Sequence, residues 1–315
     1  MGKKTSIYIW QITALEFTEK VWIEGTVIHG DYKQRKVHAT WMGHLIEVLF
    51  SYFRKPASGV RLRIRTNTEE QTVKTNRKGR FSCLLDKFMP GEMQLSHQGE
   101  ILELPGGYPY YFPQNSSSLE VVSDLDDTVL HSHTASALKR IYSILFIRPR
   151  KRKAVAYTYQ LMEWFKQQHI RVTYLSKSES NLFELIYAFI NTQELPQGAL
   201  LLSPYLKLYQ LPKPKKGKDY KYNHLKTLLT QQPDKSFILI GDDTQRDMEV
   251  YTSIIRNYPG RIQKVFIRQS SFDRQRENYW QKLQATGVPA IYFKDGDKPG
   301  EAIETLTSIL NRSAV

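Results

Sequence analysis

The stretch LEVVSD at residues 119–124 opens the part of the chain that decides the fold. It has the pattern of a short buried strand, and two similar strands follow it, HIRVTYLS at 169–176 and KSFILIGDD at 235–243. Helical spacing precedes the second strand in YQLMEWFKQQ (159–168) and follows the third in DMEVYTSIIRNY (247–258). Strands that alternate with helices predict a parallel sheet with helices on both faces.

The same alternation continues to the end of the chain. NLFELIYAFINT (181–192) and EAIETLTSIL (301–310) have helical spacing, whereas KVFIR (264–268) and VPAIYF (288–293) have the pattern of strands. We therefore expect one α/β domain over residues 116–315.

The N-terminal part has a different pattern. VWIEGTVI (21–28), HLIEVLFSYF (44–53) and VRLRIRT (60–66) alternate apolar and polar residues, as half-buried strands do. Turn residues separate these strands, and the Pro-, Gly- and Ser-rich stretch at 104–118 ends the pattern. We expect a smaller, β-sandwich-like accessory domain over residues 1–115, in which no polar cluster suggests catalysis.

Composition excludes several classes of protein. Of the 315 residues, 41% are apolar and 24% are charged, which is typical of a globular protein and not of a disordered chain. No apolar run approaches the roughly 20 residues that cross a bilayer. Cys83 is the only cysteine, so an intrachain disulfide is excluded and a reducing, cytoplasmic location is expected. From the pattern of the first residues we expect no secretion signal, although Gly2 and Ser6 match a myristoylation pattern, which leaves lipidation open.

The charge is strongly basic. The sequence has 45 Lys and Arg against 31 Asp and Glu, a net charge of +14 that attracts nucleic acid, anionic membranes or phosphorylated substrates. Two basic clusters stand out, RPRKRK at 148–153 and PKPKKGKDYK at 212–221. The first follows the apolar IYSILF (141–146), a combination that suits peripheral binding at an anionic membrane surface. A core helix and two solvated loops are the alternative interpretation.

Polar residues follow each of the three central strands. They are Asp124, Asp126, Asp127 and Thr128 after the first, Ser176 after the second, and Asp242, Asp243 and Asp247 after the third. The carboxyl ends of parallel strands share one edge of a sheet, where ligands bind. Because several carboxylates at one edge repel one another, they require a cation, and Mg²⁺ is the ion that prefers such oxygen ligands.

This set of residue types suits phosphoryl transfer. One carboxylate can attack phosphorus and form an acyl phosphate, while a second donates and then removes a proton. A hydroxyl, as in Ser176, and a lysine would hold the remaining phosphate oxygens. The sequence therefore predicts a phosphatase that works through an aspartyl phosphate.

The motifs resemble those of a known family. VVSDLDDTVL (121–130), YLSKSESNL (174–182), LPQGALLLSPY (195–205) and the long stretch at 237–268 carry the resemblance. Residues 119–293 are similar to the catalytic domain of actin-patch-associated phosphatidate phosphatases and their bacterial relatives, in the haloacid dehalogenase superfamily. The resemblance implies a haloacid-dehalogenase-like parallel-sheet domain and a phosphoric monoester hydrolase.

The resemblance also implies roles for individual residues. Asp124 would be the nucleophile and a metal ligand, and Asp126 the general acid and base, with its backbone carbonyl as another ligand. Asp242 would complete the Mg²⁺ site. Ser176 and Lys221 would bind the phosphate group of the substrate.

Other positions of the family pattern are less sharply assigned. Lys218 is the alternative to Lys221, and Asp243 and Asp247 would be metal ligands or would hold the ligands in place. Asp127 and Thr128 would shape the loop. The chain departs from the pattern at Lys177 and Glu179, where relatives often have Asn and Pro, and this departure bears on the choice of substrate.

The leading hypothesis is a Mg²⁺-dependent phosphatidate phosphatase of lipid metabolism, which converts phosphatidate to diacylglycerol and phosphate. One alternative keeps the mechanism but changes the substrate to a phosphoprotein, a nucleotide or a nucleic-acid end. The other is a non-enzymatic basic module that binds membranes or nucleic acid.

Overall fold

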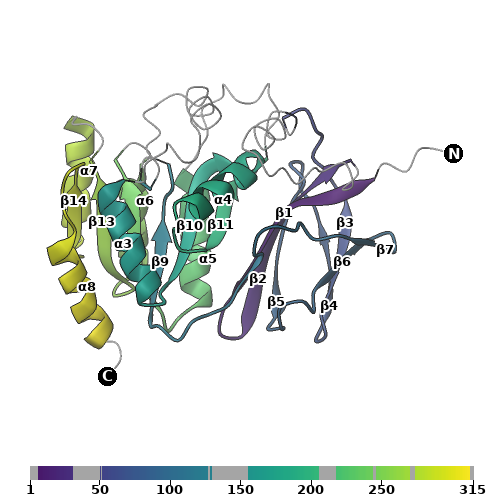
Figure 1. The fold of residues 1–315 in the computed structure, drawn as a ribbon, viewed down its shortest axis with the longest axis horizontal. Helices are drawn as coiled ribbons and strands as arrows, with labels where there is room; N and C mark the ends of the chain where they lie inside the picture. Colours follow the sequence, from purple (N-terminus) through teal and green to yellow (C-terminus); the bar gives the residue numbers. More distant parts are fainter. Residues whose placement is uncertain are drawn as a thin grey trace. The chain divides into compact units, whose positions relative to one another are not determined.

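The computed structural model (Figure 1) describes most of the chain. The described residues are 6–30, 50, 52–126, 128–129, 155–205, 218–243, 246–269 and 274–312. Several predictions lie outside them. These concern Gly2, Asp127, the apolar stretch 141–146, the basic cluster 148–153, the first six residues of the cluster 212–221, and the side chain of Lys218.

The chain divides into two compact units. The first comprises residues 1–114, 178–188 and 202–213, and the second comprises 115–177, 189–201 and 214–315. The described residues 178–188 and 202–205, which include the last residues of two strands of the predicted α/β domain, thus group with the N-terminal residues. The domain boundary near residue 115 stays a prediction.

The first unit contains two four-stranded sheets. One has the order β5–β2–β1–β8, with β1 at Ile7–Glu16, β2 at Lys20–His29, β5 at Arg80–Asp86 and β8 at Tyr111–Phe112. The other has the order β4–β3–β6–β7, with β3 at Arg61–Arg65, β4 at Glu70–Lys74, β6 at Gln94–His97 and β7 at Glu100–Leu102. Apart from the parallel pair β1 and β8, neighbouring strands are antiparallel.

Both sheets contribute to one apolar core. Ile9 and Ile23 from the first sheet and Leu62 and Leu95 from the second are fully buried in the same cluster. In β3 burial alternates with exposure, as expected for strands with one face on a core. The predicted strand at 44–53 is wrong in its described part, because the N–H of Phe53 donates to the carbonyl of Phe50 and closes a turn there.

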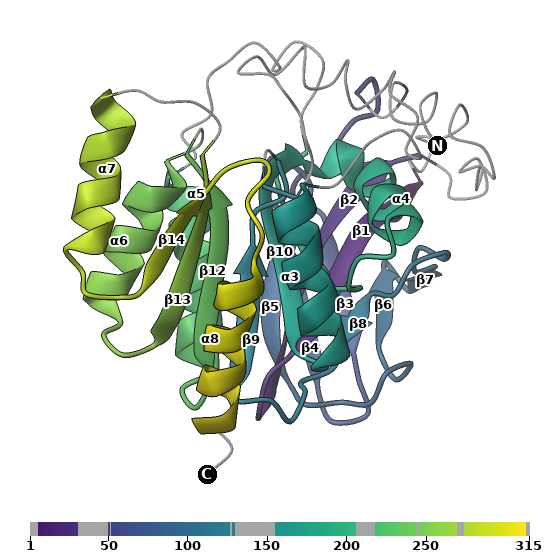
Figure 2. The same ribbon diagram turned by 60° about the vertical axis from the view of Figure 1, so that its left-hand side comes forward.

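The second unit is built on a six-stranded parallel sheet with the order β11–β10–β9–β12–β13–β14. Its strands are β9 (Leu119–Ser123), β10 (Arg171–Glu179), β11 (Ala199–Ser203), β12 (Ser236–Asp242), β13 (Ile262–Arg268) and β14 (Ala290–Phe293). The helices are α3 (Ala156–Gln167), α4 (Phe183–Thr192), α5 (Lys218–Gln231), α6 (Asp247–Asn257), α7 (Arg274–Gln284) and α8 (Gly300–Arg312). Figure 2 shows α3 and α8 on one face of the sheet and α5 and α6 on the other.

The strand order locates the ligand-binding edge of this sheet. Counted from β9, the order is 3-2-1-4-5-6, the doubly wound arrangement in which the chain leaves the first strand in one direction and later returns to its other side. The reversal falls between β9 and β12, and ligands bind beyond the carboxyl ends of the strands at such a point. The expected α/β class, a parallel sheet preceded by antiparallel β sheets, is confirmed.

A buried ion pair stabilises the opposite edge of the sheet. Arg171 of β10 lies beside Glu120 of β9, with 2.9 Å between Nη2 and Oε1, and the same guanidinium donates to Gln232. Burial raises the pKa of Glu120, while the charge of Arg171 opposes that shift. Each partner therefore compensates a charge that would otherwise be costly in the sheet interior.

Candidate active site

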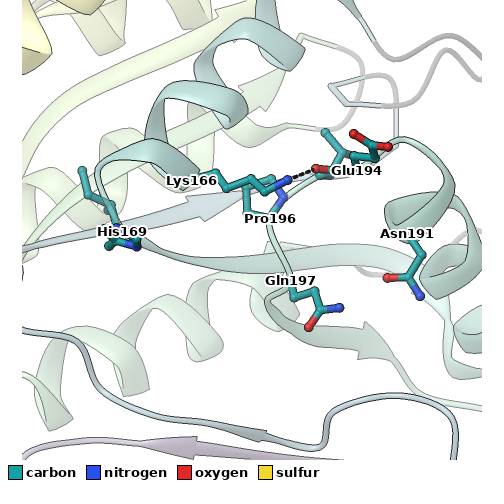
Figure 3. Close-up of a pocket in the computed structure, with 8 residues that line it drawn as sticks. Lys166, His169, Asn191, Glu194, Pro196 and Gln197 are labelled. Carbon is teal, nitrogen blue, oxygen red and sulfur yellow. Dashed lines mark hydrogen bonds between the residues drawn. The ribbon is translucent and has the colours of Figure 1, made fainter.

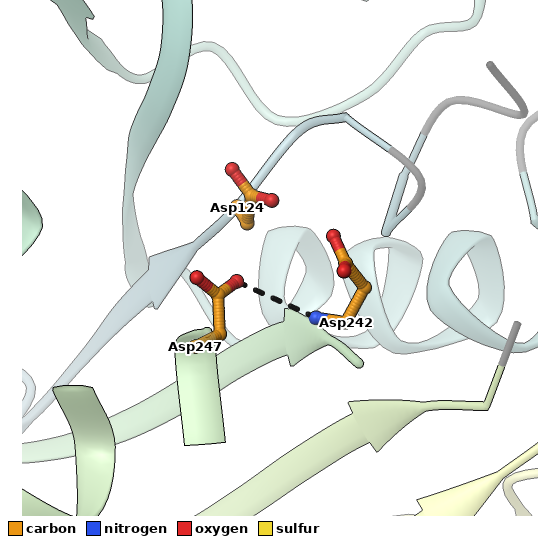
Figure 4. A group of neighbouring side chains, drawn as sticks. All are labelled: Asp124, Asp242 and Asp247. Carbon is orange, nitrogen blue, oxygen red and sulfur yellow. Dashed lines mark hydrogen bonds between the residues drawn. The ribbon is translucent and has the colours of Figure 1, made fainter. Parts of the chain in front are cut away.

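Three aspartates converge at the point where the strand order reverses. Asp124 follows β9, Asp242 ends β12 and Asp247 begins α6. Each offers a carboxylate oxygen within 4.8 Å of the other two, and all three side chains are buried (Figure 4). The predicted convergence of Asp124 and Asp242 is therefore observed, and Asp247 joins them.

Main-chain contacts hold the triad together. The N–H of Asp124 donates to the carbonyl of Ile240 in β12 at 2.8 Å, and the hydroxyl of Tyr251 donates to the same carbonyl at 2.9 Å. Gly241 gives Asp247 room to approach β12, because a Cβ at this position would lie 2.7 Å from a carboxylate oxygen of Asp247. The absence of a side chain at Gly241 is thus part of the site.

Lys221 of α5 extends into the same cluster. Its ammonium nitrogen lies 3.0 Å from Oδ1 of Asp124 and 2.6 Å from Oδ1 of Asp247. The side chain is almost completely buried. Burial acts to lower the pKa of Lys221, but the carboxylates of Asp124 and Asp247 outweigh it and raise the pKa overall. Lys221 is therefore a permanent positive charge at the centre of the cluster.

Asp126 and Ser176 form a second contact at this edge. The hydroxyl of Ser176 donates to Oδ2 of Asp126 at 2.8 Å, and both side chains are buried. Thr128 is also buried, and its carbonyl accepts a hydrogen bond from Thr158 of α3 at 2.8 Å, which suits the loop-shaping role expected of it.

Asp243 lies outside the triad, although it follows Asp242 in the chain. Its Oδ2 accepts a hydrogen bond from the hydroxyl of Tyr292 at 2.8 Å and lies 3.6 Å from the guanidinium of Arg276. Sequence reasoning missed both partners. Arg276 and Tyr292 lie on α7 and β14, far along the chain, and their local sequence carries no motif that singles them out.

The electrostatics of the triad favour a bound cation. Burial raises the pKa of Asp124 well above its ordinary value, and the charges of Asp247, Asp242 and Asp126 raise it further, while Lys221 opposes the shift. Among the described residues, Oδ1 of Asp124 has only the ion pair with Lys221, and neither carboxylate oxygen accepts a further hydrogen bond. Buried carboxylate oxygens that repel one another in this way fit a hard divalent ion such as Mg²⁺.

A separate cavity of about 540 Å³ lies at the other edge of the parallel sheet. It is lined by Lys166 near the end of α3, His169 before β10, Asn191 near the end of α4, and Glu194 and Gln197 before β11 (Figure 3). The ammonium group of Lys166 donates to the carbonyl of Glu194 there. None of the predicted site residues contributes to this cavity.

The geometry defines a class of site, namely a buried carboxylate triad with a lysine at the switch point of a parallel sheet. Comparison with known proteins then gives the family. The family described as "Phosphatidate phosphatase APP1, catalytic domain" matches residues 119–269. This part of the chain belongs to the APP1 catalytic-domain family, as the sequence motifs predicted.

Two curated relatives are distant. The chain is 26% identical over 164 residues to Phosphatidate phosphatase APP1 of Saccharomyces cerevisiae, covering 50% of this chain and 27% of that protein. It is 22% identical over 160 residues to Uncharacterized protein C29B5.04c of Schizosaccharomyces pombe, covering 48% and 25%. The chain thus spans about a quarter of the length of the curated relatives it matches.

Among solved structures, a class C acid phosphatase from Bacillus anthracis with tungstate bound is similar at 15% identity. The similarity covers 62% of this chain and 80% of that one, with a TM-score of 0.34. As for membranes, none of the helices in the described part of the chain is both long and apolar enough to span a bilayer.

Proposed function

We propose that the protein is a Mg²⁺-dependent phosphatase that works through an aspartyl-phosphate intermediate. The observation that carries this proposal is the meeting of Asp124, Asp242 and Asp247 around Lys221 at the switch point of the sheet. Membership of the APP1 catalytic-domain family supports the same reaction class.

The residues of the chain divide the chemistry among them. A carboxylate oxygen of Asp124 attacks phosphorus while the bond from phosphorus to the leaving oxygen breaks. Asp126 donates a proton to that leaving oxygen and then takes one from the water that hydrolyses the acyl phosphate. Ser176, whose hydroxyl donates to Asp126 in the free protein, turns that hydrogen bond to the phosphate group of the substrate, and the positive charge of Lys221 favours the ionised form of Asp124.

The metal site uses oxygen ligands only. Asp124, Asp242 and the backbone carbonyl of Asp126 are the proposed ligands, and Asp247 either joins them or holds them in place. When bound, Mg²⁺ offsets the negative charge of the transferring phosphoryl group. Asp243, which is engaged by Tyr292, holds the end of β12 in place rather than binding the ion.

Phosphatidate is the substrate that we propose, with diacylglycerol and phosphate as products. The proposal extends the family relationship to the substrate, and the net charge of +14 suits peripheral binding at the anionic face of a membrane from the cytoplasm. Other phosphomonoesters fit the same carboxylates, and the basic charge also suits a nucleic-acid end.

A substrate panel separates these alternatives. Phosphate release is measured with Mg²⁺ present on phosphatidate in vesicles, a soluble phosphate ester, a nucleotide, a phosphopeptide and a 3′- or 5′-phosphorylated oligonucleotide. We expect the highest kcat/KM on phosphatidate and none with Asp124→Asn. If another substrate of the panel is hydrolysed rapidly and phosphatidate is not, the protein is a phosphatase but phosphatidate is not its substrate. If no substrate of the panel is hydrolysed, the proposed phosphatase activity is wrong and the non-enzymatic binding module is the remaining alternative.

A further inference from the structure

Trp10 of β1 makes a hydrogen bond that a purely apolar core residue would not need. The indole ring is fully buried, and its N–H donates to the main-chain carbonyl of Ser180 at 2.8 Å, across 170 positions of sequence. The ring packs edge-to-face on Tyr205, with 6.0 Å between centroids. A buried indole N–H requires a partner, so this contact ties Trp10 to one particular carbonyl.

The segment that Trp10 contacts continues the strand that carries Ser176. β10 runs from Arg171 to Glu179, and the 3₁₀ helix η3 (Ser180–Leu182) follows without a break. All three residues of η3 are buried, and the segment 178–188 packs with the N-terminal β sheets. Ser180 lies four positions after Ser176, close enough for its anchoring to set where the end of β10 lies.

A second donor from the same β sheet contacts the neighbouring strand end. Arg80 of β5 donates to the carbonyl of Leu202 at 3.2 Å, near the end of β11, and also pairs with Glu24. The described residues 202–205 group with the N-terminal sheets as well. The β sheets therefore hold main-chain carbonyls at the carboxyl ends of two strands of the parallel sheet, the ends at which ligands bind.

We infer that Trp10 is a positioning residue for phosphate binding, which acts by holding the Ser180 carbonyl so that the Ser176 hydroxyl keeps its place at the active-site edge. The inference rests on the proposed function and extends it, because it gives the N-terminal β sheets a part in the reaction. Asp124, Asp242 and Asp247 lie on other segments, and Ser176 contacts the side-chain carboxylate of Asp126, whereas the main-chain carbonyl of Asp126 is the proposed ligand, so we expect the metal site to bind Mg²⁺ without this contact.

The test compares two tryptophans that have the same kind of bond. Trp10→Phe removes the indole N–H and keeps an aromatic ring. Trp22→Phe is the matched control, because Trp22 is also buried and its N–H donates to Ser82 within the sheet at 2.9 Å. Affinity for inorganic phosphate with saturating Mg²⁺, affinity for Mg²⁺ alone, and Tm are measured for the full chain.

We expect Trp10→Phe to weaken phosphate affinity about tenfold and to leave Mg²⁺ affinity at the wild-type value, whereas Trp22→Phe changes neither. Equal phosphate affinity in the two variants, or a parallel loss of Mg²⁺ affinity, overturns the inference. If Trp10→Phe fails to fold, Arg80→Gln is measured instead. It must show weaker phosphate affinity with unchanged Mg²⁺ affinity. Wild-type protein that binds no phosphate in the presence of Mg²⁺ contradicts the proposed function itself, and the inference with it.

Discussion

The ammonium nitrogen of Lys221 lies 3.0 Å from a carboxylate oxygen of Asp124. Burial and the neighbouring carboxylates raise the pKa of Asp124 well above its ordinary value, and the positive charge of Lys221 opposes that rise and so favours the ionised carboxylate. A nucleophilic carboxylate must be ionised to attack phosphorus, so this contact is a condition for the proposed reaction.

Removal of the lysine charge should therefore abolish most activity. For Lys221→Met we expect kcat/KM to fall about 10²- to 10³-fold, the size of effect that follows the loss of one preorganised electrostatic partner. Lys226→Met is the matched control, because Lys226 lies on the same helix and is exposed. Steady-state phosphate release and circular dichroism of both variants check this. Equal activity of the two folded variants would show that Lys221 has no part in the reaction.

Mg²⁺ should stabilise the fold through the aspartate triad. A ligand that binds only the folded state at 100 times its Kd adds about 2.7 kcal/mol, so Tm should rise when Mg²⁺ replaces EDTA. Asp247→Asn should reduce this rise, whereas Asp234→Asn, at an exposed position, should leave it unchanged. Differential scanning calorimetry gives the shifts. If Mg²⁺ raises the Tm of Asp247→Asn as much as that of the wild type, Asp247 is not part of the metal site.

Gly241 should be required for the metal site. In Gly241→Ala the new Cβ would lie 2.7 Å from Oδ2 and 2.9 Å from Cβ of Asp247, so this side chain must shift. We expect Mg²⁺ affinity to fall about tenfold, as when groups that support metal ligands are displaced. Gly106→Ala is the control, since nothing lies within 4 Å of a Cβ there. Calorimetric Mg²⁺ titration measures both, and unchanged affinity in Gly241→Ala would contradict the geometry.

The buried pair between Glu120 and Arg171 should matter for stability and not for chemistry. Arg171→Met leaves a buried carboxylate without its cation, a change that costs about 3–5 kcal/mol. Arg63→Met breaks an exposed pair with Glu70 and should cost at most about 1 kcal/mol. Urea unfolding measures the free energies. Equal costs for the two variants would show that burial does not govern the energetics of the pair.

Much of the active-site edge could be predicted because the relevant residues follow strands directly. Buried apolar runs locate β9 and β12, and parallel pairing brings Asp124 and Asp242 to one edge. The partners of Asp243 could not be predicted, because Tyr292 reaches it across 49 positions from another strand. Local patterns describe strands and helices, whereas such contacts depend on how distant elements pack.

In the N-terminal part, too, local sequence patterns located some strands but not the contacts between distant segments. Alternation located β2 and β3, but it also suggested a strand through Phe50–Phe53, where a local hydrogen bond closes a turn. The packing of residues 178–188 with the β sheets has no signal in the sequence, because the contact of Trp10 with Ser180 uses a main-chain carbonyl that any residue could supply.

The central claim is that Asp124 carries the phosphoryl group during turnover. The direct measurement is to quench the protein in acid during turnover of a phosphorylated substrate with Mg²⁺, reduce any acyl phosphate with borohydride, and identify the modified residue by peptide mass spectrometry. We predict reduction of Asp124 to homoserine in wild type and in Asp234→Asn, and no modified peptide in Asp124→Asn. A modified residue elsewhere, or turnover that persists in Asp124→Asn, would contradict the account.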